Sequence, residues 1–241
     1  MSAPHLNCHV CRTPFPPEDL SQSQGIAFCR RCQTLIRLDR HQPGAPRHPV
    51  AAAGFRPQVA LPVGWDIQPT TQELRIVYHW FSATSFLLLF LCLFWFGFLV
   101  MWLTRAHQLP PAGPGLWFLS LLQIGIGLFL SYITLAGFLN TTTITVKQGH
   151  LTVVHAPLPW FQPPPLRTAD ITQLFVRRVS VGKQHSRREV YSVWAQLRQG
   201  REVKLMYGLE APEQALFVEQ QLEAFLGITD RPVPGELERW Q

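Results

Sequence analysis

The chain has 241 residues, with 21 Lys and Arg against 15 Asp and Glu, and its formal net charge is +6. This modest basic excess suits a protein beside an anionic membrane surface, and by itself it is too small to indicate nucleic-acid binding. The mean hydropathy is only +0.07. The chain contains two strongly apolar blocks, so the residues outside them must be of ordinary polarity. The first 25 residues contain no apolar run of the signal-peptide kind, so we expect no cleaved leader.

Four of the five cysteines form two Cys-x-x-Cys pairs near the N-terminus, separated by 17 residues. This spacing is typical of a structural zinc site, because a two-residue gap lets both thiolates of a pair reach one tetrahedral ion at about 2.3 Å. The sequence therefore predicts a small domain over residues 1–40 that needs the metal to fold. The predicted Zn²⁺ ligands are Cys8, Cys11, Cys29 and Cys32.

This segment resembles zinc ribbons, and its knuckle spacing is also that of rubredoxins, which leaves iron as the alternative metal. It departs from the rubredoxin pattern because Arg12 and Gln33 stand where a glycine usually follows each pair. Two disulfides would need an oxidising compartment, and a redox Cys-x-x-Cys would need a βαβ context. Neither alternative fits this short, proline-flanked stretch as well as a metal site does.

Residues 41–72 are rich in Pro, Ala and Gly. This composition predicts a semi-extended linker with little packing, on which the ribbon is mobile relative to the membrane. The following stretch, 73–78, is either a short strand or the first turns of a helix, and so few residues do not decide between them.

Two apolar blocks, 80–103 and 116–139, contain no Lys, Arg, Asp or Glu. Each block has 24 residues and as a helix would extend about 36 Å. This length is enough to cross the hydrocarbon core of a bilayer, which is about 30 Å thick. Helices buried in a soluble core would instead show a polar stripe. We predict a transmembrane hairpin over 73–139, with aromatic residues at the ends of its helices in the pattern of a membrane interface. These are Tyr78, Trp80, Phe81, Trp102, Trp117 and Phe118.

Basic residues predict the orientation of this hairpin. Eight Arg precede Trp80, twelve Lys or Arg follow Leu139, and only Arg105 lies between the two blocks. The positive-inside rule therefore places both termini in the cytoplasm. The absence of ionisable residues within the blocks favours an anchor over a transporter. Gly127, Ser131 and Gly137 offer small surfaces for close helix contact, either within the hairpin or in a homo-oligomer.

Residues 140–228 predict a small antiparallel β domain that is closed by one amphipathic helix. Strands are expected over 140–146, 151–155, 171–181, 190–197 and 202–207. The helix should begin at Pro212 and end before Gly227, because proline suits a first turn and glycine a C-terminal cap. We expect its carboxylates to lie on a solvated face, and residues 229–241 to form a loose tail. These carboxylates are Glu213, Glu219 and Glu223.

A run of strands that ends in one helix, following a spanning helix, resembles the pleckstrin-homology-like domains of small bacterial membrane proteins. Taken whole, the ribbon, hairpin and β domain resemble bacterial membrane proteins that carry no assigned activity, and the stretches 140–144 and 156–160 contribute to this likeness. The resemblance implies a multi-pass membrane protein of the mixed α+β class in the inner membrane of a bacterium, and it implies no catalytic residues.

Basic residues gather around the connection between the third and fourth of these strands. In a domain tethered to a bilayer they could contact anionic headgroups, at about 1 kcal/mol for each residue near the surface. The alternative is an ordinary solvated hairpin loop. The residues are Arg177, Arg178, Lys183, Arg187 and Arg188.

No motif of nucleotide binding, metalloprotease or nucleophilic catalysis occurs, so we expect no enzyme. The sequence favours a membrane-anchored adaptor that faces the cytoplasm and binds protein partners through the ribbon and the β domain. Nucleic-acid binding is not expected, because no long basic stripe with stacking aromatics occurs. Two alternatives stay open: a membrane protein linked to nucleic acid through its ribbon, and an accessory subunit of a membrane enzyme.

Overall fold

The computed structural model describes residues 6–8, 10–16, 19–21, 25–38, 59–70, 72–106, 114–182 and 188–237. The chain divides into two compact units. The first comprises residues 1–77, 143–154 and 162–241, and the second comprises residues 78–142 and 155–161.

The N-terminal part of the first unit is a three-stranded antiparallel sheet made of β1 (Leu20–Ser21), β2 (Ile26–Cys29) and β3 (Thr34–Arg37). Its own buried cluster consists of Cys8, Cys29 and Ile36. So small an apolar core cannot offset the entropy of ordering the segment, which agrees with a fold that depends on a bound metal.

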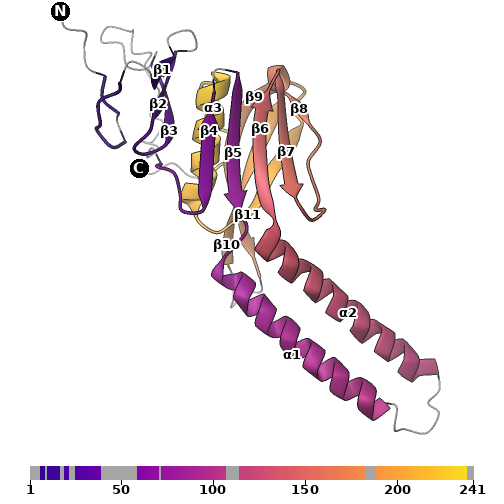
Figure 1. The fold of residues 1–241 in the computed structure, drawn as a ribbon. Coiled ribbons are helices and arrows are strands. Elements are labelled where there is room, and N and C mark those ends of the chain that lie inside the picture. Colours follow the sequence, from indigo (N-terminus) through magenta and orange to yellow (C-terminus); the bar gives the residue numbers. More distant parts are fainter. Residues whose placement is uncertain are drawn as a thin grey trace, which may run out of the picture. The chain divides into compact units, whose positions relative to one another are not determined.

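Two further sheets form the rest of this unit (Figure 1). The larger has the order β4-β5-β6-β7-β8, and the smaller has the order β11-β10-β9. Apolar side chains alternate along the strands with period two, as Leu74 and Ile76 on β5 and Ile144 and Val146 on β6 show by their burial. The strands are β4 (Trp65–Pro69), β5 (Glu73–His79), β6 (Thr141–Lys147), β7 (His150–Ala156), β8 (Leu166–Arg167), β9 (Ile171–Val181), β10 (Arg188–Leu197) and β11 (Glu202–Leu209).

The structure adds one strand to the sequence prediction, because β4 lies within the predicted linker. The stretch 73–78, left open between strand and helix, belongs to strand β5, so it does not begin the spanning hairpin. In the sheet β5 lies between β4 and β6, and β6 follows only after both apolar helices, so the pairing of β5 with β6 leaves no local signal in the sequence. Residues 41–58 of the predicted linker lie outside the described residues.

The C-terminal elements occur where the sequence predicted them. The five expected strands correspond to β6, β7, β9, β10 and β11, with ends shifted by two residues at most. The closing helix is α3 (Pro212–Leu226). Gly227 follows it in the left-handed conformation, with φ of 72°, and its N–H donates to the carbonyl of Glu223. This C-terminal cap confirms the role predicted for that glycine.

The expectation that the carboxylates of α3 are solvated is wrong for two of the three. Glu219 is fully buried and Glu223 is nearly so, whereas Glu213 is exposed. The reason is that α3 packs against β9 and β10 and also against β3 of the ribbon. Phe217 of α3 additionally meets Trp65 of β4 edge to face, with ring centroids 6.2 Å apart. A helix covered from several sides has no continuous solvated face.

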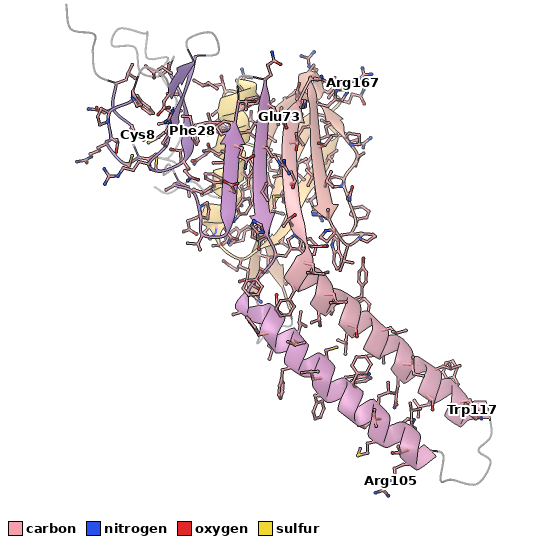
Figure 2. The ribbon with its side chains drawn as sticks, in the orientation of Figure 1. Cys8, Phe28, Glu73, Arg105, Trp117 and Arg167 are labelled. Atoms are coloured by element: carbon pink, nitrogen blue, oxygen red, sulfur yellow. The ribbon has the colours of Figure 1, made fainter. Side chains whose placement is uncertain are left out.

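The second unit contains two long helices, α1 (Ala83–Ala106) and α2 (Pro114–Leu139), which run side by side (Figure 1). Both are long and apolar enough to cross a membrane. Only 11% and 17% of their most apolar stretches are buried, so neither resembles the core helix of a soluble domain. Figure 2 labels Arg105 and Trp117 at the end of the hairpin where the two helices are connected.

Polar and small side chains line the contact between α1 and α2. Trp102 Nε1 donates to Ser120 Oγ at 3.2 Å, and Trp95 Nε1 donates to the carbonyl of Gln123 at 3.1 Å. A Cβ atom on Gly127 would lie 3.2 Å from Trp95 Cδ1, and one on Gly137 would lie 3.0 Å from Ser85 Oγ. The close contact predicted for these glycines is therefore confirmed within the hairpin, where it allows the helix backbones to approach.

This packing predicts different effects for two neighbouring glycines of α2. Gly127→Val should destabilise the hairpin by about 1–3 kcal/mol, because the new side chain overpacks against Trp95. Gly125→Val is the matched control, since no atom lies within 4 Å of a Cβ at that position. Thermal unfolding of the full-length protein in detergent measures the difference. Equal unfolding temperatures for the two variants would contradict the helix contact.

Candidate metal centre

The two cysteine pairs lie on two hairpins of the same local design. In the second hairpin Cys29 on β2 is paired with Thr34 on β3. In the first, the N–H of Cys8 donates to the carbonyl of Thr13 at 2.8 Å. Each turn is closed by the residue after its second cysteine: the N–H of Arg12 donates to the Cys8 carbonyl, and that of Gln33 to the Cys29 carbonyl, both at 2.7 Å. The chain thus builds the same knuckle twice.

The two residues that replace the usual glycine adopt the conformation that glycine favours. Arg12 has φ of 59° and Gln33 has φ of 51°. A side chain in this left-handed region costs roughly 1–2 kcal/mol. The backbone of each turn therefore accommodates the non-glycine residue that distinguishes this sequence from the rubredoxin pattern. Because this conformation is strained, contacts around the turn must hold it in place.

The four predicted ligands converge on one point. Their sulfur atoms all lie within 4.8 Å of one another. Cys8 Sγ is 3.6 Å from Cys32 Sγ, and Cys11 Sγ is 3.4 Å from Cys29 Sγ. A tetrahedral ion with metal–sulfur bonds of about 2.3 Å spaces its ligands about 3.8 Å apart, so the donor set fits a single ion. All four are free thiols.

Two threonines support these ligands, and the sequence analysis missed both. Thr13 Oγ1 lies 3.3 Å from Cys11 Sγ, and Thr34 Oγ1 lies 2.9 Å from Cys32 Sγ. Arg31 Nη1 also donates to Thr13 Oγ1 at 3.3 Å, which links the two knuckles. The signal was present in the sequence, because each pair continues as Cys-x-x-Cys-x-Thr. Hydrogen bonds to metal-bound sulfur orient the ligands and tune the site.

The thiols differ in how readily they lose a proton. Hydrogen bonding to the Thr13 side chain lowers the pKa of Cys11 to about 6. Burial raises the pKa of Cys8 and that of Cys32. A metal ion that binds here must displace protons from the buried thiols, so its affinity falls as the pH falls.

The ribbon contacts α3 of the β domain directly. The N–H of Leu35 on β3 donates to Gln221 Oε1 at 2.7 Å, in a buried hydrogen bond. On the neighbouring residue of α3, Gln220 Oε1 accepts the N–H of Val59 at 3.1 Å. The carbonyl of the ligand Cys32 accepts the N–H of Leu61 at 3.3 Å. The ribbon thus packs on α3 through β3 within one compact unit. Its mobility relative to the membrane stays a prediction.

The basic residues predicted to contact lipid have carboxylate partners within the domain, as far as the structure describes them. Arg177 forms a bidentate pair with Glu202, at 2.6 and 2.9 Å. Arg178 pairs with Glu189 at 3.5 Å. Arg188 pairs with Glu210. Lys183 and Arg187 lie outside the described residues. Contact with anionic lipid stays a prediction, and these ion pairs would compete with headgroups for three of the five side chains.

No protein-family model matches this chain, and no curated protein is similar to it at a significant level. What defines it is thus its own architecture: a mixed α+β protein with antiparallel sheets, two long apolar helices and four cysteines that can hold a metal ion.

The hydrogen bond between Leu35 and Gln221 yields a test of the docked ribbon. Gln221→Leu should leave the Leu35 N–H buried without an acceptor, at a cost of about 1–3 kcal/mol. The ribbon should then separate from α3 more often, and a chelator should extract metal from the full-length protein at least about tenfold faster. Gln199→Leu, at an exposed turn, is the control. Equal extraction rates for both variants and the wild-type protein would contradict the docking.

Proposed function

We propose that this protein is a membrane-anchored adaptor that presents its metal-stabilised ribbon and its β domain to protein partners on the cytoplasmic face of a bacterial inner membrane. The observation that carries this proposal is the neighbouring position of β5 and β6 in one sheet. These strands precede and follow the helical hairpin, so the chain leaves the sheet, passes through α1 and α2, and returns to the same sheet. Once the hairpin spans a bilayer, everything outside it lies on one side.

The proposed metal is Zn²⁺. Four thiolates in a tetrahedral arrangement are a donor set that zinc prefers, and iron is the alternative for the same set. Such a shell has no open coordination position, so the ion's role in this proposal is to stabilise the ribbon. Its ligand Cys32 is also tied through its backbone to Leu61, which leads into β4. Metal binding would thereby influence the surface that the ribbon and α3 form together.

The proposed hairpin is an anchor, because its outward surface consists of large apolar side chains such as Phe90, Phe94 and Phe129. Its polar atoms lie mainly at the contact between the helices. The resemblance to pleckstrin-homology-like domains is supported by two antiparallel sheets and a closing helix, and that family assignment is part of the proposal.

A protein partner is favoured over nucleic acid by two of the five arginines within residues 1–40. Arg30 pairs with Asp19 at 2.8 Å, and Arg31 donates to Thr13. Both guanidinium groups thus have structural partners, which leaves them less suited to phosphate contacts.

Crosslinked capture with the full-length protein tests the proposal. The wild-type protein should resist extraction from membranes by alkaline carbonate and contain about one equivalent of zinc. It should also capture a specific set of cytoplasmic proteins, which Cys29→Ser with Cys32→Ser loses and Cys92→Ser, in helix α1, retains. Identical capture by all three proteins would contradict a role for the ribbon. Less than about half an equivalent of zinc, without iron, would contradict the metal site.

A further inference from the structure

The segment that follows β7 returns to the end of α2. Residues 156–161, with the sequence Ala-Pro-Leu-Pro-Trp-Phe, belong to the same compact unit as the hairpin. Asn140, the first residue after α2, holds this segment with both ends of its buried amide. Its Oδ1 accepts the N–H of Leu158 at 2.8 Å, and its Nδ2 donates to the Leu158 carbonyl at 3.1 Å.

The same segment continues along α2. The hydroxyl of Tyr132 donates to the carbonyl of Pro159. The ring of Tyr132 lies nearly parallel to that of Trp160, with centroids 6.2 Å apart and an interplanar angle of 5°. Tyr132 precedes the last residue of α2, Leu139, by two helical turns, or about 10 Å along the helix axis. Trp160 therefore lies beside the last turns of α2, between the rings of Tyr132 and Trp80.

The depth of this position follows from the length of α2. A helix of 26 residues extends about 39 Å and exceeds a hydrocarbon core of about 30 Å by roughly 4–5 Å at each end. A residue about 10 Å from the helix end would then lie about 5 Å inside the hydrocarbon boundary. Tyr132 would reach this depth, and Trp160 lies against its ring.

The backbone of residues 156–159, the part of the segment that is bonded to α2 and to the residues after it, suits such an environment. Bilayer hydrocarbon offers no water, so backbone polar groups must be paired internally. Pro157 and Pro159 have no N–H, and the N–H of Leu158 between them is bonded to Asn140. The carbonyls of Leu158 and Pro159 accept from Asn140 and Tyr132, and the carbonyl of Ala156 accepts from Thr141 Oγ1 at 3.4 Å.

The side chains around the segment present apolar surface and keep their polar atoms paired. Trp80 meets Trp160 edge to face at 5.2 Å, while its Nε1 donates to Thr142 Oγ1 at 2.7 Å. Thr142 Oγ1 is in turn 2.9 Å from Nδ1 of His155, and burial lowers the pKa of His155, which keeps this imidazole neutral at neutral pH. The side chain of Phe161, at the end of the segment, is 87% exposed.

From this geometry we propose that residues 156–161 form a second membrane contact, in which Trp160 and Phe161 insert between the lipids at the boundary of headgroups and acyl chains, alongside α2. The inference rests on the proposed insertion of the hairpin in a bilayer. It adds a lipid-facing role to a loop of the β domain, which would fix how the chain emerges from the membrane. Tryptophan and other aromatic side chains favour this boundary.

The test uses full-length protein in phosphatidylcholine vesicles, with a fluorescent nitrobenzoxadiazole label on a single new cysteine in a Cys92→Ala background. Phe161→Cys probes the segment, and Phe129→Cys, on the exposed surface of α2, is the reference. The label at position 161 should be quenched by a nitroxide on the upper acyl chain to within about twofold of the label at position 129. A water-soluble nitroxide should quench it weakly. The background protein without a new cysteine corrects for labelling of the ribbon.

Two outcomes would overturn the inference, and they are distinguishable. If the label at position 129 is quenched by lipid while that at position 161 is quenched only from water, the segment is not inserted and the hairpin anchor stands. If neither label is quenched by lipid, membrane insertion of α2 fails, and the proposed anchor fails with it.

Discussion

The structure depends on one contact made across a long stretch of chain, the neighbouring position of β5 and β6 in one sheet. Both strands bury apolar side chains, and Glu73 on β5 and Lys147 on β6 form an ion pair at 2.8 Å. At the other end of these strands, the N–H of Trp80 donates to the carbonyl of Asn140 at 3.1 Å. Closing so long a loop costs entropy, but this cost grows only slowly with length and is offset by the pairing of the strands. The ends of the helical hairpin are thereby held together by the strands that continue from them.

The ribbon depends on two supports outside its own apolar residues. Its buried cluster is too small for independent stability, and a metal ion held by the four thiols would supply one support. The packing of β3 on α3, with Leu35 bonded to Gln221, supplies the other. The buried side of α3 is therefore shared between the ribbon and the β domain, which explains why a helix of this length has so many buried polar side chains. Under the proposed function, a partner would meet the ribbon and the domain as one surface.

The sequence predicted the features that local patterns determine. The apolar helices follow from length and the exclusion of charge, the cysteine cluster from its spacing, and the end of α3 from Gly227. Most features it did not predict depend on contacts between distant residues: the pairing of β5 with β6, the burial of Glu219, the docking of β3 on α3, and the bond from Tyr132 to Pro159. Strand β4 was missed for another reason, because the proline-rich composition of residues 41–72 indicated a linker, although β4 pairs with the next strand, β5. Thr13 and Thr34 were also missed, but they could have been predicted, since each follows its cysteine pair at the same position in the sequence.

The central claim is that chain segments before and after the hairpin form one sheet, and intramolecular crosslinking tests it most directly. A protease site is inserted between α1 and α2 of the full-length protein, and Glu73→Cys is combined with Lys147→Cys. After treatment with a short bis-maleimide and cleavage, the account predicts that the two halves remain joined on a denaturing gel. Each single variant controls for reaction with native cysteines, and its halves should separate. Separation of the halves in the double variant as well would contradict the pairing of β5 with β6.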